Sequence, residues 1–365
     1  MAGPALAFSP LLSGCAAGAY EEQVSATWSL ASDDPPEERT MDRRSWIEAA
    51  TLAASGHNTQ PWRFKVYDDR IEIAPDPERR LPVVDPNDRE QWLSLGCATE
   101  NLVIAAAADG YATNVRLPTD DEEGITIVPA AAPDSEISGA ATGFDAIPER
   151  QNTRSVYDGT PVPAADLETI GATPVEMGIS VTLVTNGETL EGIVDLVMTG
   201  DRTQYSNQAF VDELVAWLRF NRREALRTLD GLYSGSSGNP NLPRWLGKRF
   251  VTTSYGPKQA ETDAAAIRSS AGMIVIASER DDKAAWVRTG RVYERLALTL
   301  TTLEIQSAML NQPVEVPALR PQLGELVGLG NAQPQLLMRF GYGETMPRSL
   351  RRPVDAVSTV VSQSS

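Results

Sequence analysis

Strict alternation of hydrophobic and polar positions marks one β-hairpin near the start of the chain. Apolar residues recur at every second position within 64–74, on both sides of the polar triplet Asp68-Asp69-Arg70. Alternation with period two buries one face of a strand, and a short polar break between two such runs is typical of a hairpin. Further strands are predicted at 125–130 and at 335–343, where a buried run ends in glycines.

A long apolar stretch predicts a helix that is buried on every side. The segment 92–112 has no charged residue between Asn101 and Ala108, as expected at the centre of a domain. A later stretch repeats its pattern, Trp-x3-Gly-x3-Glu-x-Leu, at a constant offset. Such a repeat indicates either a duplicated unit or a chance likeness between helices of similar composition. The matching residues are Trp92, Gly96, Glu100 and Leu102, and Trp286, Gly290, Glu294 and Leu296.

Three stretches interrupt this pattern. Residues 31–39 are polar and proline-rich, which predicts a linker, and residues 131–146 are small and polar enough to join two halves. Residues 217–259 hold an arginine-rich helix and then a loop of Gly, Ser and Asn at 232–243. This lid-like excursion is interpreted either as a mobile cover over a site or as an inert surface insertion.

Composition narrows the classes of function. The chain has 365 residues, 42% of them hydrophobic, and a formal net charge of -17. An acidic chain lacks the net basic face that nucleic-acid binding requires, so no nucleic-acid partner is expected. The single histidine, His57, and the two cysteines offer no metal-ligand spacing, so no metal site is expected. Cys97 lies in the apolar helix, where it is expected to be a buried small residue.

The first residues suggest a processed leader. Residues 1–17 are apolar and uncharged but too short to span a bilayer as a mature helix. Leu12-Ser13-Gly14-Cys15 resembles a bacterial lipobox, which implies lipidation of Cys15 and a place in the cell envelope. A signal peptide requires a basic residue before its apolar run, and none precedes this one. The segment 1–39 is therefore interpreted as a truncated export signal with its linker. The alternatives are a vestigial signal, or an inert apolar tail on a cytoplasmic chain.

Polar residues gather where the helix predicted at 43–54 gives way to the hairpin. Gly56 breaks the helix and Pro61 forces its predecessor out of helical geometry. The turn is therefore expected to present free donors and acceptors, which suit a planar heterocycle with several carbonyls and ring nitrogens. A helix cap followed by a surface turn is the simpler alternative. The candidate binding residues are Ser55, His57, Asn58 and Gln60.

The stretch Ala53–Phe64, Ala-Ala-Ser-Gly-His-Asn-Thr-Gln-Pro-Trp-Arg-Phe, resembles the flavin-contacting motif of the nitroreductase family. The resemblance is closest to the double-length, Acg-like FMN-binding proteins, and it covers about residues 43–354. It implies an α+β, nitroreductase-like fold that is internally duplicated to mimic the family homodimer. The halves would be 40–135 and 145–356, and the chain would be a monomer.

Three more stretches match the family in the expected order. Arg150, Asn152 and Arg154 resemble its Arg-x-Ser-x-Arg phosphate clamp, in which two guanidinium groups fork onto one phosphate. Gln312, Pro313 and Val314 resemble the loop along the flavin ring, and Gln312-Pro313 also echoes Gln60-Pro61. Arg351 and Arg352 match the basic pair that completes the phosphate site. Because the clamp occurs only once, the resemblance implies one FMN per chain.

The resemblance implies an FMN-dependent oxidoreductase with no catalytic side chain, because the flavin carries the chemistry. NAD(P)H is the expected donor, and an electron-poor nitro or quinone compound is the expected acceptor. The alternative is a flavin-binding or flavin-storing protein whose lid leaves little reductase activity. A third interpretation is a lipoprotein whose flavin site is vestigial. Export of a flavin-loaded chain would have to follow folding in the cytoplasm, which favours the twin-arginine route.

Overall fold

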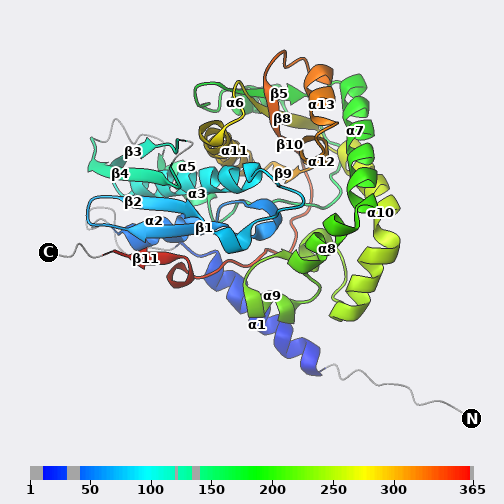
Figure 1. Ribbon diagram of the computed structural model, residues 1–365, viewed down its shortest axis with the longest axis horizontal. Coiled ribbons are helices and arrows are strands. Elements are labelled where there is room, and N and C mark those ends of the chain that lie inside the picture. Colours follow the sequence, from blue (N-terminus) through cyan, green and yellow to red (C-terminus); the bar gives the residue numbers. More distant parts are fainter. Residues whose placement is uncertain (1–10, 31–41, 120–121, 134–139, 362–365) are drawn as a thin grey trace, which may run out of the picture.

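The computed structural model describes residues 11–30, 42–119, 122–133 and 140–361. Side chains are described for these residues except 11–15, 140–142 and 254–257. Two separate, largely antiparallel sheets are joined by a layer of two long helices, which makes the architecture α+β (Figure 1). Further helices flank the second sheet on the side away from the first.

The first sheet contains the predicted hairpin. Its strand order is β11-β1-β2-β4-β3, and β1 pairs with β2 in antiparallel register from Trp62 opposite Pro75 to Val66 opposite Ile71. The C-terminal strand β11 returns to this sheet and lies parallel to β1. The strands are β1 (Trp62–Val66), β2 (Ile71–Pro75), β3 (Tyr111–Arg116), β4 (Ile125–Ala131) and β11 (Ser358–Val360).

The second sheet has the order β5-β8-β10-β9, with every pair antiparallel. Taken in chain order, its strands follow the same path as β1, β2, β3 and β4 in the first sheet. Every residue of β8 is buried, as expected of a central strand covered on both faces. The strands are β5 (Ile179–Val184), β8 (Gly272–Ser278), β9 (Gln306–Met309) and β10 (Gln333–Gly341).

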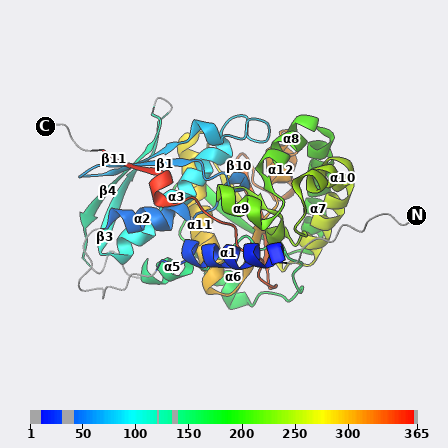
Figure 2. The same cartoon turned by 90° about the horizontal axis from the view of Figure 1, so that it is seen from below.

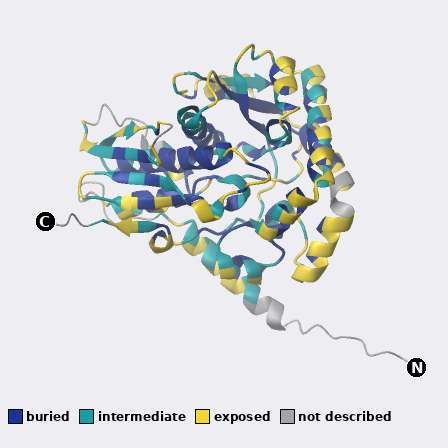
Figure 3. Ribbon diagram, viewed as in Figure 1, coloured by how far each residue is buried: buried dark blue, intermediate teal, exposed yellow. Residues whose placement is uncertain are grey.

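The two helices that carry the repeated sequence pattern pack against each other at its glycines. They are α3 (Arg89–Ala108) and α11 (Lys283–Thr302), and most of their residues are buried (Figure 3). A Cβ atom on Gly96 would lie 2.2 Å from the carbonyl oxygen of Val287, and one on Gly290 would lie 1.9 Å from that of Leu93. The contact is reciprocal, and only glycine at both positions allows the backbones to approach so closely.

A large insertion separates β5 from β8, whereas the equivalent strands β1 and β2 are joined by a tight hairpin. The insertion runs through residues 187–268, so the predicted bounds of the excursion, 217–259, were too narrow. The predicted arginine-rich helix is α9, and the predicted loop contains a short strand and a 3-10 turn. Its elements are α7 (Gly187–Ser206), α8 (Gln208–Trp217), β6 (Leu218–Arg219), α9 (Arg222–Thr228), β7 (Leu232–Tyr233) and α10 (Arg244–Arg268).

The remaining helices lie at the edges. Helix α1 crosses the underside of the molecule beside α9 (Figure 2). Within the described residues, no helix is long and apolar enough to cross a bilayer. The predicted lipidation site, Cys15, belongs to α1, but its side chain lies outside the described part, as do residues 1–10 and 31–39 altogether. The helices are α1 (Leu11–Thr27), α2 (Arg43–Thr51), α5 (Ala140–Ala146), α6 (Ala164–Gly171), α12 (Gln312–Glu315) and α13 (Arg320–Leu326).

Candidate functional site

The turn between α2 and β1 contains three non-glycine residues with left-handed backbone. Their φ angles are 47° at His57, 52° at Asn58 and 53° at Gln60. A side chain with a Cβ atom makes this conformation unfavourable, so it persists only where the surroundings enforce it. Concentrated backbone strain of this kind is typical of functional sites. The conformation therefore supports the sequence-based choice of this turn.

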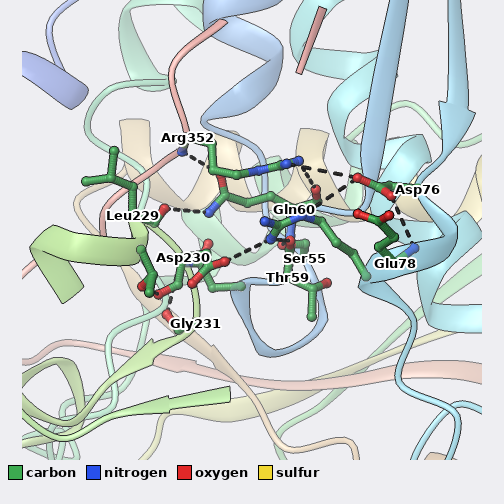
Figure 4. Close-up of polar contacts among 12 residues, drawn as sticks. Ser55, Thr59, Gln60, Asp76, Glu78, Leu229, Asp230, Gly231 and Arg352 are labelled. Atoms are coloured by element: carbon green, nitrogen blue, oxygen red, sulfur yellow. Dashed lines mark hydrogen bonds and ion pairs between the residues drawn. The ribbon is translucent and has the colours of Figure 1, made fainter. Parts of the chain in front are cut away.

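The side chain of Gln60 is fully buried and joins two distant segments to the turn (Figure 4). Its Nε2 donates to the Leu229 carbonyl at 2.9 Å, and its Oε1 accepts from the Arg352 backbone N–H at 2.7 Å. The Gln60 backbone N–H donates in turn to Ser55 Oγ at 3.1 Å. Gln60 thus fixes the position of the insertion and of the C-terminal segment relative to the turn.

Asn58 makes the same kind of connection. Its Nδ2 donates to the carbonyls of Gly231 at 3.0 Å and Leu350 at 3.1 Å. The prediction that the turn presents its polar groups freely is therefore wrong for Ser55, Asn58 and Gln60, because most buried polar groups must be hydrogen-bonded within the protein. Two buried atoms of the turn have no partner, Nδ1 of His57 and Oδ1 of Asn58.

Ion pairs reinforce the contact between the turn and the insertion (Figure 4). Arg79 donates both to the Thr59 carbonyl at 2.8 Å and to Asp230 Oδ2 at 2.9 Å. Asp230 also accepts from Arg219 at 2.6 Å. Burial alone would raise the pKa of Asp230, but the hydrogen bonds from Arg219 and Arg79 lower it overall. The loop 229–231 is consequently held over the turn by a charged side chain as well as by backbone contacts.

The first arginine of the predicted phosphate clamp is buried beneath the turn. Arg150 forms an ion pair with Glu294 of α11 at 2.8 Å, and its Nη2 donates to the Leu52 carbonyl at 2.6 Å. Burial raises the pKa of Glu294, and the Arg150 guanidinium opposes that rise. The repeat had singled out Glu294 as a marker of duplication, but nothing in the sequence indicated that it faces the clamp.

Arg351 lies in the same buried cluster. Its Nη2 donates to the carbonyls of Leu52 and Ala53, both at 3.3 Å, at the C-terminal end of α2. Burial and, secondly, the Arg150 charge lower the pKa of Arg351 to about 9. Burial likewise lowers the pKa of Arg348, and Arg150 lowers it further. Three guanidinium groups therefore share a region that contains one buried carboxylate.

Trp28, which follows α1, covers this cluster from outside. The Arg348 and Arg351 guanidinium carbons lie 4.7 Å and 4.9 Å from its ring centroid, close enough for cation–π attraction. Its Nε1 donates to the Ser349 carbonyl at 2.9 Å. Sequence reasoning missed Trp28, since a single aromatic residue before a linker gives no sign of a contact about three hundred residues away.

The other arginine of the pattern, Arg154, lies in different surroundings. Its side chain is exposed, its nearest polar contact is Ser237 Oγ at 3.4 Å, and its charge adds to burial in lowering the pKa of His57 to about 4. Between the two arginines, Asn152 pairs its backbone with Ser307 and accepts from the Tyr293 hydroxyl at 3.4 Å. Arg150 and Arg154 share no contact among the described residues, which does not support the expectation that both fork onto one phosphate.

Arg352 turns the other way, towards the turn and the first sheet. Its Nη2 donates to the Gln60 carbonyl at 2.9 Å, and its Nη1 lies 4.0 Å from Asp76 Oδ2. Burial and the nearby Arg79 lower its pKa to about 10. The predicted basic pair is thus split between the cluster around Glu294 and the turn.

The predicted ring-edge loop forms α12 and contacts the insertion. Gln312 Nε2 donates to Asp263 of α10 at 2.8 Å and to Asp201 of α7 at 3.1 Å, while Pro313 and Val314 are buried. The echo between Gln312-Pro313 and Gln60-Pro61 is not a repeat, because the first pair follows β9 and the second precedes β1. These positions are not equivalent in the two sheets.

The carboxyl groups of Asp201 and Asp263 both have raised pKa values, mainly because they are buried. Burial, and next the neighbouring Asp263 carboxylate, raise the pKa of Asp201 to about 8.

A small cavity of about 10 Å³, enough for roughly one water, lies under the turn and is lined by residues such as Gly56 and Glu90. Within the described residues, no set of three or more His, Cys, Asp or Glu side chains is placed to hold a metal ion.

Comparison with known proteins agrees with the sequence motifs. The chain is 26% identical over 334 residues to a Mycobacterium tuberculosis protein named "Putative NAD(P)H nitroreductase", with 86% of this chain and 90% of that one covered. A second protein of that organism, "Putative NAD(P)H nitroreductase acg", is 25% identical over 328 residues, with 86% and 94% covered. The chain is a distant homologue of these nitroreductases. No family model matches its sequence.

Solved structures give a weaker likeness. A nitroreductase with bound FMN from Bacteroides fragilis covers 55% of this nitroreductase homologue at 18% identity, with 88% of its own chain covered and a TM-score of 0.33. The FMN-dependent nitroreductase NfnB of Mycobacterium smegmatis, in complex with NADPH, covers 56% at 14% identity, with 89% of its own chain covered and a TM-score of 0.37. The similarity to named nitroreductases therefore rests on the sequence relatives.

Proposed function

We propose that this protein is an FMN-dependent oxidoreductase that passes hydride from NAD(P)H to an electron-poor acceptor of the nitro or quinone type. The full-length sequence relatives support the reaction class, since they are named as NAD(P)H nitroreductases. The observation that carries the proposal is the pair of buried guanidiniums, Arg150 and Arg351, which share one buried carboxylate, Glu294, beside the strained turn. Few functions other than anion binding account for buried, uncompensated positive charge.

The cluster fits a phosphate monoester. Arg150 and Arg351 share a single buried carboxylate, Glu294, whereas the partly exposed Arg348 pairs with Glu149 at 3.2 Å. Arg351 also has a lowered pKa and an unpartnered buried Nε. A phosphate dianion would remove the mutual repulsion and accept charge-assisted hydrogen bonds, which are the strongest available to guanidinium groups. We assign Arg150 and Arg351 to the phosphate of FMN, with Arg348 as a supporting charge.

The two sheets and central helices support an internal duplication. Both sheets have the same strand path, and α3 and α11 meet at glycines that match in the sequence repeat. In this interpretation the FMN site lies between the halves, and the strand β11 ties the C-terminal segment of the second half to the first sheet. Because the halves already cover each other, the chain is proposed to be a monomer.

The glutamates of the repeat support one FMN per chain. Glu294 faces Arg150 and the candidate site, whereas its counterpart Glu100 pairs with Arg291 at 2.7 Å and Arg295 at 2.5 Å. Glu176, just before β5, closes this second network through Arg295 at 2.7 Å. The second location therefore has its charges already neutralised, which leaves no uncompensated positive charge for a phosphate.

The chain itself supplies binding and position. When bound, FMN provides a ring that takes hydride from NAD(P)H and gives it to the acceptor. Gln60 and Asn58 hold the turn, the C-terminal segment and the insertion in one arrangement, so the walls of the site are fixed before any substrate arrives. His57 stays neutral at physiological pH because burial and Arg154 lower its pKa, so it offers an uncharged nitrogen to its neighbours.

A flavin-storing protein is the second candidate, and one observation favours it. The loop 229–231 is bonded to Asn58, Gln60 and Arg79, so opening the insertion must break several buried contacts at once. A firmly closed insertion would keep NAD(P)H and acceptors away from the flavin. Both candidates predict bound FMN, and they differ in whether the flavin can be reduced from solution.

One experiment separates them. The visible spectrum of the purified chain, with flavin released by denaturation and counted, is expected to show one FMN per chain. Anaerobic NADH or NADPH should bleach the flavin of a reductase and leave that of a storage protein unchanged. Arg351→Ala should weaken FMN binding by roughly ten- to a hundredfold. FAD, two flavins per chain, or undiminished affinity in Arg351→Ala would contradict the proposed site.

Arg154→Ala tests the remaining part of the predicted clamp. If Arg154 reaches the phosphate when FMN is bound, this variant also loses affinity. If the phosphate is held by the buried cluster alone, the variant keeps FMN as tightly as the unaltered chain.

Placement in the cell envelope through a lipid on Cys15 is a separate proposal, tested by fractionating cells that express the gene with its upstream codons.

A further inference from the structure

The beginning of α10 exposes aromatic and basic side chains together. Trp245 is 71% exposed, and Leu246 and Phe250 are 37% and 40% exposed. Lys248 and Arg249 lie between them and are exposed as well. Figure 3 shows this end of α10 as exposed over most of its circumference.

The buried face of this segment fixes which side chains point outward. Gly247 and Val251 face the rest of the insertion, and a Cβ atom on Gly247 would lie 2.2 Å from the ring of Phe220. With about 100° of rotation per residue, Trp245 and Arg249 lie on the side opposite to Gly247 and Val251. The helix is therefore anchored by one side while its most exposed aromatic residue points directly into solvent beside a cation.

Charge is concentrated at the same place. The whole chain carries a net charge of -17, but residues 217–250 contain seven Lys or Arg residues and only two acidic ones. Both acidic residues are engaged, Asp230 with Arg219 and Glu224 with Arg244. Among residues 217–250, all of which the structure describes, four exposed cations form no ion pair. They are Arg223, Arg227, Lys248 and Arg249.

We propose that this surface, formed by the start of α10 together with α9, docks onto a lipid bilayer that carries anionic headgroups. Tryptophan beside Lys and Arg is the composition of interfacial helices, in which the ring enters the headgroup region and the cations contact lipid phosphates. An anionic bilayer would repel the acidic remainder of the chain and attract only this surface. The docked orientation is therefore unique.

The position of the surface gives docking a consequence. The insertion that carries it also places the loop 229–231 over the strained turn, so the membrane would contact the cover of the candidate site directly. Figure 1 places the start of α10 and the N-terminal end of α1 on the same lower side of the molecule. A lipid on Cys15, if present, would thus tether the same side, although docking by α10 does not depend on it.

The test uses the purified full chain without lipid modification. It is mixed with vesicles of phosphatidylcholine alone or with added phosphatidylglycerol, and bound protein is separated by sedimentation. Binding is expected only with phosphatidylglycerol, and it should weaken several-fold as salt rises from low to physiological concentration. Trp245→Ala and the pair Lys248→Gln with Arg249→Gln should each lower binding at least several-fold without changing the melting temperature.

Matched substitutions control for general loss of hydrophobicity or charge. Met177→Ala removes an apolar side chain that is 84% exposed, and Arg280→Gln removes an exposed cation; both should bind vesicles like the unaltered chain. Equal binding to neutral vesicles, no binding to anionic vesicles, or equal loss in the control variants would overturn the proposal. Retention on single-stranded DNA but not on vesicles, lost in the same variants, would assign the surface to nucleic acid instead.

Discussion

Glu294 and Arg150 form an ion pair at 2.8 Å in which neither side chain is exposed by more than 3%. Arg150 therefore has two functions, to neutralise the glutamate of the central helix and to place positive charge at the proposed phosphate site. Removing one member of a buried pair leaves the other charge uncompensated, which is more harmful than removing both.

Arg150→Met is accordingly expected to lower the free energy of unfolding by about 3–5 kcal/mol, because Glu294 would remain buried without its partner. The double variant Arg150→Met with Glu294→Gln should recover most of this loss. Denaturant unfolding of the apoprotein measures both. If the double variant is no more stable than the single one, the pair does not determine the stability of this region.

Gly290→Ala tests the close crossing of the two central helices. The added methyl group would lie 1.9 Å from the Leu93 carbonyl oxygen, a backbone atom that cannot move aside, so a loss of about 3 kcal/mol is expected. Gly171→Ala is the control, because nothing lies within 4 Å of its Cβ position in α6. That change should be neutral or stabilise by up to about 1 kcal/mol. Similar melting temperatures for the two variants would contradict the crossing.

Trp28→Ala should weaken FMN binding although Trp28 is not expected to touch the cofactor. Its ring lies 4.7–4.9 Å from the Arg348 and Arg351 guanidinium carbons, and losing it lets water reach both groups. A cation–π contact contributes about 0.5–2 kcal/mol, so losing one of the two should lower the affinity by roughly three- to thirtyfold, and losing both should lower it further. Trp28→Phe keeps an aromatic face and should retain most of the affinity in a fluorescence titration. Equal affinity in all three proteins would show that the stacking does not position the arginines.

His57 predicts an acid-sensitive fold. Its pKa in the folded chain is about 4, below its ordinary 6.5, so the unfolded chain takes up the proton first as pH falls. The stability contributed by the neutral imidazole is fully present above about pH 6.5 and is lost as pH falls towards 4. His57→Gln should remove this part of the pH dependence in thermal unfolding of the apoprotein. An unchanged profile would mean that the imidazole is not enclosed as described.

Asp201 predicts the opposite dependence at higher pH. Its pKa is raised from 3.8 to about 8, mainly by burial and then by Asp263, so the folded chain holds a proton that the unfolded chain releases. The stability of the protonated form is complete below about pH 3.8 and is lost as pH rises to 8. Asp201→Asn keeps the shape of the side chain and removes its charge. The free energy of unfolding of this variant should therefore depend less on pH across this range. Equal protection of the α7 amides from hydrogen exchange at pH 5 and pH 8, after correction for the intrinsic pH dependence of exchange, would contradict the prediction.

Local patterns were sufficient to place some of the elements. Alternation located the hairpin of β1 and β2, the uncharged run located α3, and Gly56 with Pro61 located the strained turn. These features depend on neighbouring residues only, through periodicity and backbone preference, and so they can be read from the chain directly. The sequence also proposed Arg150 and Arg351 as phosphate ligands, because motifs fix which residue types are present, and this stays a prediction.

Only the tertiary structure decided what those residues contact. Asn58 bonds to Leu350, 292 positions away in the chain, and Trp28 covers arginines from the opposite end of the sequence. No local pattern records which buried donor meets which acceptor, because that choice follows from packing the whole chain at once. For the same reason the sequence predicted free polar groups at Gln60, whereas folding buries its side chain and bonds it to two distant segments.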